Sequence, residues 1–326
     1  YLIYYKFYKQ NIYLKDIEKN KNNYIFNQFL LSENEKSYFT KIKNEIYIPL
    51  IDSYKFEKSS FISSLDGSYI NSGPSGAPTR GKLEVLPTGK NFYSIDTRIL
   101  PTESAWFVGN QSAQQILSLY KQDNGTDLKY LAISTWATST MRNGGEDICQ
   151  ILSLMGVKPI WDGPSRRVID LEVIPINILG RPRVDVLLRI SGMFRDAFPE
   201  LIKLLSKAIK LIANLNEQNL DNPLAQKYRN NESINRIFGS APSCYGAGLQ
   251  DLISNASWES IDDLGDAYLS WSNYKYDENI EGELGKDELE KALKNIELVM
   301  HNQDNKEHDI LDSDDYYQFQ GGITAA

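Results

Sequence analysis

The chain has 326 residues, 41% of them hydrophobic, and a formal net charge of −8, so it is long enough to bury one large core or two smaller ones. The negative balance argues against nucleic acid as a partner, and no apolar run reaches the roughly 18 residues that a transmembrane helix needs. With no signal-peptide core at its start and only two widely spaced cysteines, we expect a cytoplasmic protein without a disulfide framework.

The N-terminal 58 residues place aromatic and aliphatic side chains at helical spacing, which predicts helices that cover a neighbouring surface. Because the first residue is Tyr rather than Met, we also expect a fragment of a longer protein. Residues 65–102 are rich in proline and glycine and predict a long ordered loop. Within this loop, GAPTRGKL (Gly76–Leu83) approaches a phosphate-binding P-loop. Leu83 stands where Mg²⁺ needs a hydroxyl, so we expect no nucleotide here.

The centre of the chain alternates strand and helix patterns. Residues 130–136 and 184–190 form β-rich or continuously apolar runs, and residues 157–161 restart a strand. A helix is expected from Glu146 to a stop at Gly156, and apolar positions from 194 to 215 form one helical stripe whose regular part starts near Ala197. This order predicts an α/β fold, with a doubly wound parallel sheet as its core and flanking helical segments.

Ligands of such sheets bind at the carboxyl ends of the strands. Arginine and acidic residues occur together after two of the expected strands: Arg142 precedes Glu146 and Asp147, and Arg195 precedes Asp196. We therefore expect Arg142, Arg195 and Asp196 to bind a ligand.

Two further stretches have a structural and a functional interpretation. FGSAPSCYGAG (residues 238–248), which contains Tyr245, predicts either a tight turn or close approach of the backbone to a ligand. Arg181 and Arg183 of LGRPRVDV can pair with a ligand or with carboxylates of the fold, and structural ion pairs are the commoner outcome.

After about residue 220 the pattern becomes helical and acidic. DELEKALKNIELVMHNQ predicts a helix that continues into HNQDNKEHDILDSDDYYQF (residues 301–319), which holds both histidines of the chain. On such a helix His301, Asp304 and His308 share one face, and two imidazoles with a carboxylate suit a divalent transition ion such as Co²⁺, Ni²⁺ or Zn²⁺. The glycine that an EF-hand calcium loop requires is missing.

This acidic run has two interpretations. It is either a solvated surface, or a site where interspersed apolar residues draw carboxylates out of water until they share a cation or a proton.

Several motifs together resemble the CobN/magnesium chelatase family. They are SGPSGAPTRGKLEVLPTGKNFYSIDTRILPTESAW, GGEDICQILSLMGVKPIWD, LGRPRVDVLLRISGMFRDAFPELI, RIFGSAPSCYGAGLQ and HNQDNKEHDILDSDDYYQFQGG. The last has the form typical of the cobalt branch. The resemblance covers residue 59 to the C-terminus and implies an α/β chelatase core with a long loop (59–220) and a mainly helical acidic segment with the His/Asp motif (221–326). Residues 1–58 carry no motif of the family and form the helical covering segment that their spacing predicts.

The resemblance implies part of the large subunit of an ATP-dependent aerobic cobaltochelatase, which inserts Co²⁺ into hydrogenobyrinic acid a,c-diamide during cobalamin biosynthesis. The expected partners are an AAA+ ATPase subunit that hydrolyses ATP with Mg²⁺, and a second small subunit. The alternatives are a magnesium chelatase H subunit that inserts Mg²⁺ into protoporphyrin IX, and a non-catalytic tetrapyrrole-binding remnant. The family also carries an upstream HG-x-x-E-W block that this chain lacks. We therefore expect either that a separate upstream fragment completes the subunit, or that the chain is a remnant of a split or decaying gene.

The resemblance also assigns roles to individual residues. The catalytic candidates, which act as bases and guide the metal, are His308, Asp309, Asp312 and Asp314. The metal candidates are His301, Asp304 and His308. The substrate-binding candidates are Arg195, Asp196, Arg142 and Tyr245.

Overall fold

The computed structural model describes residues 33–74, 78, 83–93, 95–304 and 313–326, and the chain divides into two compact units between Ser94 and Ile95. In the first unit, helix α4 (Glu33–Ile42) continues through a wider π-type segment (Lys43–Tyr47) into α5 (Ile48–Leu65), as the helical spacing predicts. No glycine or proline interrupts α5 between Pro49 and its end. The boundary expected after residue 58 therefore falls inside this helix.

The proline- and glycine-rich segment of the first unit packs along α5. Its two short strands, β1 (Ser72–Pro74) and β2 (Asn91–Tyr93), pair in parallel. The backbone N–H of Thr88 donates to Ser53 Oγ at 2.9 Å, and Ser60 Oγ donates to the Gly89 carbonyl at 2.5 Å. The described parts of this segment are thus held in place by hydrogen bonds, as the prediction of an ordered loop requires. Most of the P-loop-like stretch, residues 76, 77 and 79–82, lies outside the described residues.

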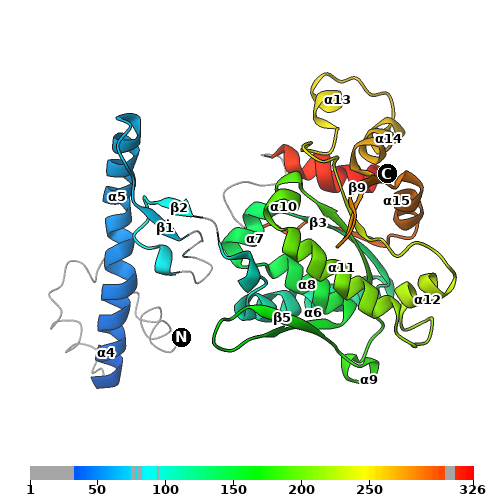
Figure 1. The fold of residues 1–326 in the computed structure, drawn as a ribbon, viewed down its shortest axis with the longest axis horizontal. Helices are drawn as coiled ribbons and strands as arrows, with labels where there is room; N and C mark the ends of the chain where they lie inside the picture. Colours follow the sequence, from blue (N-terminus) through cyan, green and yellow to red (C-terminus); the bar gives the residue numbers. More distant parts are fainter. Residues whose placement is uncertain (1–32, 75–77, 79–82, 94, 305–312) are drawn as a thin grey trace. The chain divides into compact units, whose positions relative to one another are not determined.

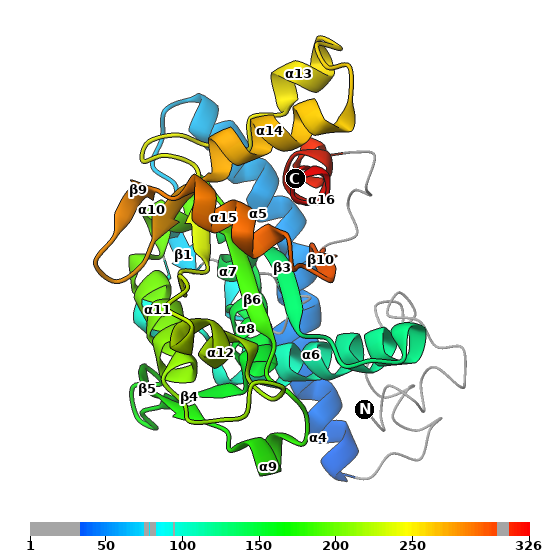
Figure 2. The same cartoon turned by 90° about the vertical axis from the view of Figure 1, so that its right-hand side faces the viewer.

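The second unit is built on a six-stranded sheet with the order β10-β3-β6-β7-β8-β9 (Figure 1). The strands β10, β3, β6 and β7 are parallel, and β8 and β9 add an antiparallel edge. Figure 2 shows β3 and β6 side by side. The strands are β3 (Tyr130–Thr135), β6 (Asp185–Ile190), β7 (Ile237–Gly239), β8 (Tyr274–Tyr276), β9 (Glu281–Leu284) and β10 (Leu298–Met300).

Helices cover both faces of this sheet. On one face, α8 (Glu146–Met155) and α11 (Pro199–Ala213) pack against Leu131, Ile133 and Leu188. On the other, α14 (Ile261–Ser272), α15 (Lys286–Leu293) and α16 (Gly322–Ala325) pack over Ala132 and Leu187. All six residues of β6 are buried because the strand is covered on both sides. The predicted doubly wound α/β core is confirmed.

The apolar stripe after β6 forms two helices instead of one. α10 (Gly192–Ala197) ends at Phe198, where the backbone leaves the helical region, and α11 begins at Pro199. Proline is tolerated at a first helical position because it has no N–H to donate. The expected start near Ala197 therefore holds to within two residues, and the stripe residues are buried: Phe194, Phe198, Leu201, Leu205, Ala208 and Ile212.

Residues 157–161 form a strand as expected, but outside the parallel sheet, and one expected helix ends early. Residues 157–161 form β4 (Val157–Trp161), which pairs antiparallel with β5 (Val168–Val173) in a separate two-stranded sheet. Its exposure alternates, because only one of its faces is covered. The helix expected to continue into His301 ends at Leu293. Residues 298–300 then pair in parallel with β3 as β10, and residues 301–304 are irregular. The C-terminal segment therefore supplies an edge strand of the central sheet.

The remaining helices of the second unit are α6 (Glu103–Asn124), α7 (Ala137–Asn143), α9 (Ile176–Leu179), α12 (Pro223–Arg229) and α13 (Gln250–Ser254), with a π-type segment at Tyr316–Gly321. Within the described ranges, no helix is both long and apolar enough to cross a bilayer.

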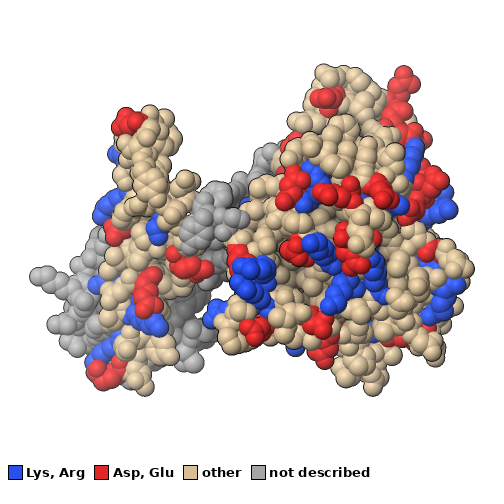
Figure 3. All heavy atoms as spheres, in the orientation of Figure 1, with Lys and Arg blue, Asp and Glu red and all other residues tan. Residues whose placement is uncertain are grey.

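On the face shown in Figure 3, basic and acidic side chains of this unit are interspersed. Along α11, Lys203 pairs with Glu200 and Lys207 with Asp170, at 2.8 and 2.7 Å.

Candidate functional site

Polar and aromatic side chains gather where the four parallel strands end. β3 is followed by residues 136–143, β6 by 191–197, β7 by 240–249 and β10 by 301–304. Because the carboxyl ends of parallel strands lie along one edge of a sheet, these four segments adjoin. The edge holds six of the residues singled out in the sequence: Arg142, Arg195, Asp196, Tyr245, His301 and Asp304.

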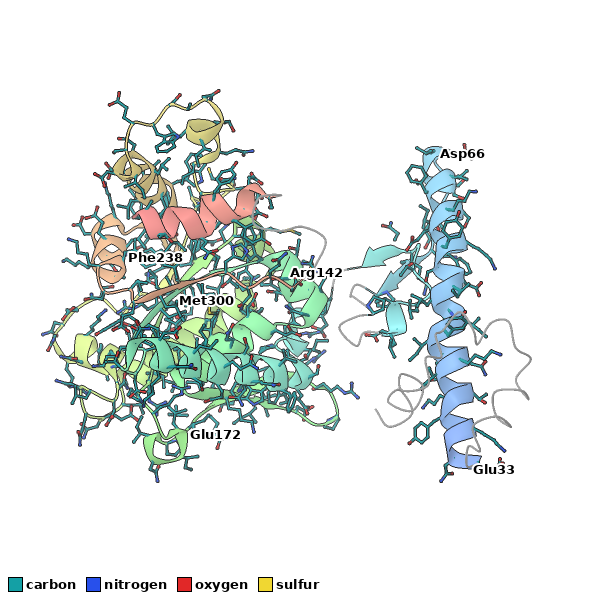
Figure 4. All side chains as sticks on the ribbon, turned by 180° about the vertical axis from the view of Figure 1, so that it is seen from behind. Glu33, Asp66, Arg142, Glu172, Phe238 and Met300 are labelled. Atoms are coloured by element: carbon teal, nitrogen blue, oxygen red, sulfur yellow. The ribbon has the colours of Figure 1, made fainter. Side chains whose placement is uncertain are left out.

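A bidentate ion pair joins two of these segments. Arg142, in the last turn of α7, donates from Nη2 to Asp304 Oδ1 at 2.6 Å and from Nε to Asp304 Oδ2 at 3.0 Å. Figure 4 labels Arg142 and also Met300, the last residue of β10. The side chain of Asp304 is 9% exposed and that of Arg142 is 38% exposed. Asp304 was expected to bind metal and Arg142 to bind substrate. In this structure the two side chains bind each other.

Asn302 ties the same segment to α8. Its Nδ2 donates to Asp147 Oδ1 at 2.7 Å and to Gln150 Oε1 at 2.6 Å. Gln150 in turn donates to Ser112 Oγ of α6 at 2.9 Å. Asp147 lies in the first turn of α8, as expected, and it is buried. The sequence analysis did not single out Asn302. The only hint was Asp147, because a carboxylate that is buried at a helix start needs a hydrogen-bond donor beside it.

His301 lies among aromatic rings. Its centroid is 5.5 Å from that of Trp136 and 4.7 Å from that of Tyr316, and Trp136 contacts Phe319 edge-on at 4.4 Å. The other members of the His/Asp motif, His308, Asp309 and Asp312, lie outside the described residues. Among residues 33–304 and 313–326, apart from the gaps given above, no three His, Cys, Asp or Glu side chains come together as a metal site would require.

Asp314 lies on the far side of that undescribed stretch and is tied to the loop after β7. Its Oδ2 accepts from Gln318 Nε2 at 2.7 Å, and Gln318 Oε1 accepts from the N–H of Ala247 at 3.4 Å. The described residues on both sides of the stretch 305–312 are therefore fixed to the carboxyl edge: Asp304 to α7, and Asp314 through Gln318 to the loop after β7.

Arg195, Asp196 and Tyr245 form a connected group. Arg195 donates from Nε and Nη2 to the two carboxylate oxygens of Asp196 at 2.7 and 3.1 Å. Tyr245 donates its hydroxyl to Asp196 Oδ2 at 2.7 Å. The hydrogen bond from Arg195 holds the pKa of Asp196 below its usual range, and the bond to Asp196 raises the pKa of Tyr245 because it favours the neutral phenol.

The Arg195 guanidinium is itself buried, and it also binds backbone carbonyls. Its Nη1 donates to the carbonyls of Ser240, Ala241 and Cys244 at 3.3, 2.7 and 3.1 Å. Arg195 therefore shapes the loop after β7, while Asp196 and Tyr245 present the exposed atoms of the group.

A second buried arginine, which sequence reasoning missed, acts on the same loop. Arg189 of β6 donates from Nη2 to the Gly246 carbonyl at 2.8 Å and from Nε to Ser272 Oγ at 3.0 Å. Its guanidinium lies 5.0 Å from the Phe319 ring centroid, and burial lowers its pKa. The available signal was an arginine inside an otherwise apolar strand.

Arg181 and Arg183 have structural partners at the end of α8. Arg183 pairs with Glu217 at 2.7 Å and donates to the carbonyls of Met155 and Gly156, both at 3.1 Å. Arg181 donates to the carbonyls of Ser153 and Leu154. The structural interpretation is confirmed, although Arg181 binds backbone carbonyls rather than a carboxylate.

Comparison with known proteins gives a consistent result. The CobN/Magnesium Chelatase family model matches residues 9–326. The chain is 46% identical over 286 residues to the aerobic cobaltochelatase subunit CobN of Pseudomonas aeruginosa (83% of this chain, 23% of the relative), and 45% identical over 309 residues to that of a Sinorhizobium species (90% and 24%). It superposes on the catalytic subunit of cobaltochelatase from Mycobacterium tuberculosis with a TM-score of 0.83 and 40% identity, covering 90% of this chain and 26% of that one. The chain thus spans about a quarter of the length of these relatives.

Proposed function

This chain belongs to the CobN/magnesium chelatase family, and from that premise we propose that it forms part of the large subunit of an aerobic cobaltochelatase. The reaction is the insertion of Co²⁺ into hydrogenobyrinic acid a,c-diamide in cobalamin biosynthesis, and the working location is the cytoplasm. The observation that carries the proposal is the gathering of the Arg142–Asp304 pair, His301 and the Arg195–Asp196–Tyr245 group at one sheet edge.

Metal insertion makes two chemical demands on such an edge. The inner N–H proton of the corrin macrocycle must leave as Co²⁺ binds the ring nitrogens, and Co²⁺ must lose its water ligands. Carboxylates and imidazoles accept protons and hold a divalent ion in transit. We assign the proton-accepting and metal-guiding roles to His308, Asp309, Asp312 and Asp314, and metal contacts to His301, Asp304 and His308. Asp304 already binds the Arg142 guanidinium through both of its carboxylate oxygens, so the ion would share this carboxylate with Arg142.

Substrate binding is assigned to Arg142, Arg195, Asp196 and Tyr245. The macrocycle carries peripheral carboxylate and amide groups, which suit the partly exposed guanidinium of Arg142 and the exposed Asp196–Tyr245 hydrogen bond. Arg195 acts through Asp196, because it is buried and its Nε and Nη1 already bind Asp196 and backbone carbonyls.

The energy source is assigned to other chains. An AAA+ ATPase subunit hydrolyses ATP with its Mg²⁺, a second small subunit completes the complex, and an upstream fragment supplies the HG-x-x-E-W block. This division agrees with Leu83, which occupies the hydroxyl position of the P-loop-like stretch.

Two other functions fit the same family: a magnesium chelatase H subunit that acts on protoporphyrin IX, and a non-catalytic remnant that binds a tetrapyrrole. The experiment is a reconstituted insertion assay with both small subunits, ATP, and a polypeptide that carries the rest of the large subunit, run with and without this chain. We expect cobalt incorporation into hydrogenobyrinic acid a,c-diamide only when the chain is present. Magnesium incorporation into protoporphyrin IX instead would favour the second function, and macrocycle binding without insertion of either metal would favour the third.

A further inference from the structure

Two residues with exposed aromatic side chains, one in the loop after β7 and one on α14, are joined by a hydrogen bond. Tyr245, in the loop after β7, is 60% exposed, and Trp271, near the end of α14, is 41% exposed. The Trp271 Nε1–H donates to the Tyr245 carbonyl oxygen at 3.3 Å, which makes them neighbours. Single exposed apolar residues are ordinary on protein surfaces, so exposure alone does not indicate a site. What sets this pair apart is how firmly it is held.

The Tyr245 ring is fixed at both ends. Its hydroxyl is bound to Asp196, which the buried Arg195 holds in turn, and the Arg195 guanidinium lies 5.5 Å from the ring centroid. One edge of the ring, Cδ1 and Cε1, lies against Gly192 at the start of α10. A Cβ on Gly192 would stand 2.5 Å from Tyr245 Cδ1 and 2.8 Å from the Cys244 carbonyl oxygen. The ring therefore occupies space that any other residue at position 192 would fill.

Trp271 is held in a similar way. Besides its bond to the Tyr245 carbonyl, its side chain lies against Gly248, which has a left-handed backbone with φ of +83°. A Cβ at Gly248 would stand 2.9 Å from Trp271 Cβ and 3.0 Å from Cγ. Two glycines, one in contact with each ring, thus allow both aromatic side chains to lie close against the backbone while a face stays open to solvent.

We propose that the Tyr245–Trp271 pair is a preformed stacking surface for the flat face of the macrocycle. This inference rests on the proposed function and adds Trp271, Gly192 and Gly248 to the residues assigned there. A side chain that is already held in place loses little conformational entropy when a planar ligand stacks on it. Less of the binding free energy is then spent on ordering the side chain. Tyr245 lies on the segment that follows β7, beside the Asp196 carboxylate of the segment that follows β6, and Trp271 adjoins it from α14.

The test measures binding of hydrogenobyrinic acid a,c-diamide to the full chain by absorbance titration, which does not depend on tryptophan fluorescence. Trp271→Ala and Tyr245→Ala are each expected to raise Kd about tenfold, by analogy with the loss of one base-stacking aromatic. Tyr245→Phe keeps the ring and is expected to raise Kd less than Tyr245→Ala does. The matched control is Trp258→Ala, since Trp258 is equally exposed at 43% but precedes α14 and lies outside the pair.

The outcomes separate this inference from the proposed function. Wild-type affinity in both Trp271→Ala and Tyr245→Ala, with an intact thermal transition, would overturn the stacking surface and leave the proposed function standing. An equal loss in Trp258→Ala would overturn it too, because the effect would then not be specific to the pair. If the unaltered chain binds the macrocycle no better than millimolar, both proposals fail together.

Discussion

Asp304 and Arg142 lie 162 residues apart in the chain and meet through two hydrogen bonds at the carboxyl edge of the sheet. The pair fixes the segment after β10 to the end of α7, next to Asn302, which fixes the same segment to α8. One face of the candidate site is therefore built by long-range polar contacts. Breaking them changes the position of the segment that leads into the His/Asp motif.

The strength of the Arg142–Asp304 pair can be measured with a double-mutant cycle. We expect a coupling free energy of about 1 kcal/mol in urea unfolding of Arg142→Ala, Asp304→Ala and the double variant, since the geometry is bidentate but Arg142 is partly in water. The Lys203–Glu200 pair on α11, which is exposed on both sides, serves as the control and is expected to give a smaller coupling. A coupling indistinguishable from that control would mean that the pair does not fix the segment.

The Asp196–Tyr245 hydrogen bond predicts a pH dependence. Because the pKa of Tyr245 is raised in the folded state, this bond stabilises the fold fully below pH about 10, and its contribution is lost as the pH rises through the raised pKa. At the acid end, the pKa of Asp196 is lowered, so the contribution of its ionised form is present above pH about 4 and is lost as the pH falls through the lowered value.

This is measured by ultraviolet difference titration of the wild type against Tyr245→Phe, which isolates one phenol. Asp196→Asn is expected to move the pKa of Tyr245 back toward its ordinary value, because the amide no longer carries the charge that opposes phenolate formation. An unchanged titration in Asp196→Asn would rule out the carboxylate as the cause.

Gly192 predicts a steric effect with a clear control. Gly192→Ala places a Cβ against both the Tyr245 ring and a backbone carbonyl, so it is expected to lower the free energy of unfolding by about 1–3 kcal/mol and to displace the loop after β7. At Gly163→Ala the new Cβ meets no atom within 4 Å, and a change under about 0.5 kcal/mol is expected. Equal stability of the two variants in thermal unfolding would show that the close approach at Gly192 does not affect the free energy of unfolding.

The His/Asp motif predicts a loss of chemistry with the fold preserved. His308→Ala and Asp312→Asn are each expected to reduce cobalt insertion by about 100-fold in the reconstituted assay, the range of general acid–base catalysis, while Tm and macrocycle Kd stay unchanged. Asp266→Asn, at an exposed acidic position of α14, is the control and should insert cobalt normally. Unfolding of either motif variant would instead assign these residues a structural role.

Local patterns predicted the parts of the fold that local physics determines. The continuous apolar run ending at Ile190 became a fully buried central strand, and the acid-started stretch ending before Gly156 became α8. Arg142, Arg195 and Asp196 were placed at strand ends because polar residues that follow buried strands emerge at the sheet edge.

Non-local pairing explains the misses. Residues 298–300 form a very short segment that follows a helix. They become a strand because they pair with β3, which is distant in the sequence. The surroundings of His301 are likewise set by Trp136 and Tyr316, which no helical spacing connects to it. Contacts such as Asn302 with Asp147 follow from the packing of β10, so they became visible only with the fold.

The central claim is that the carboxyl edge of the parallel strands receives the macrocycle. Hydrogen–deuterium exchange of the full chain, with and without hydrogenobyrinic acid a,c-diamide, tests it most directly. We expect slower exchange in residues 191–196 and 240–248 and no change in the β4–β5 sheet, residues 157–173. Protection confined to the β4–β5 sheet, with the two edge segments unchanged, would contradict the claim.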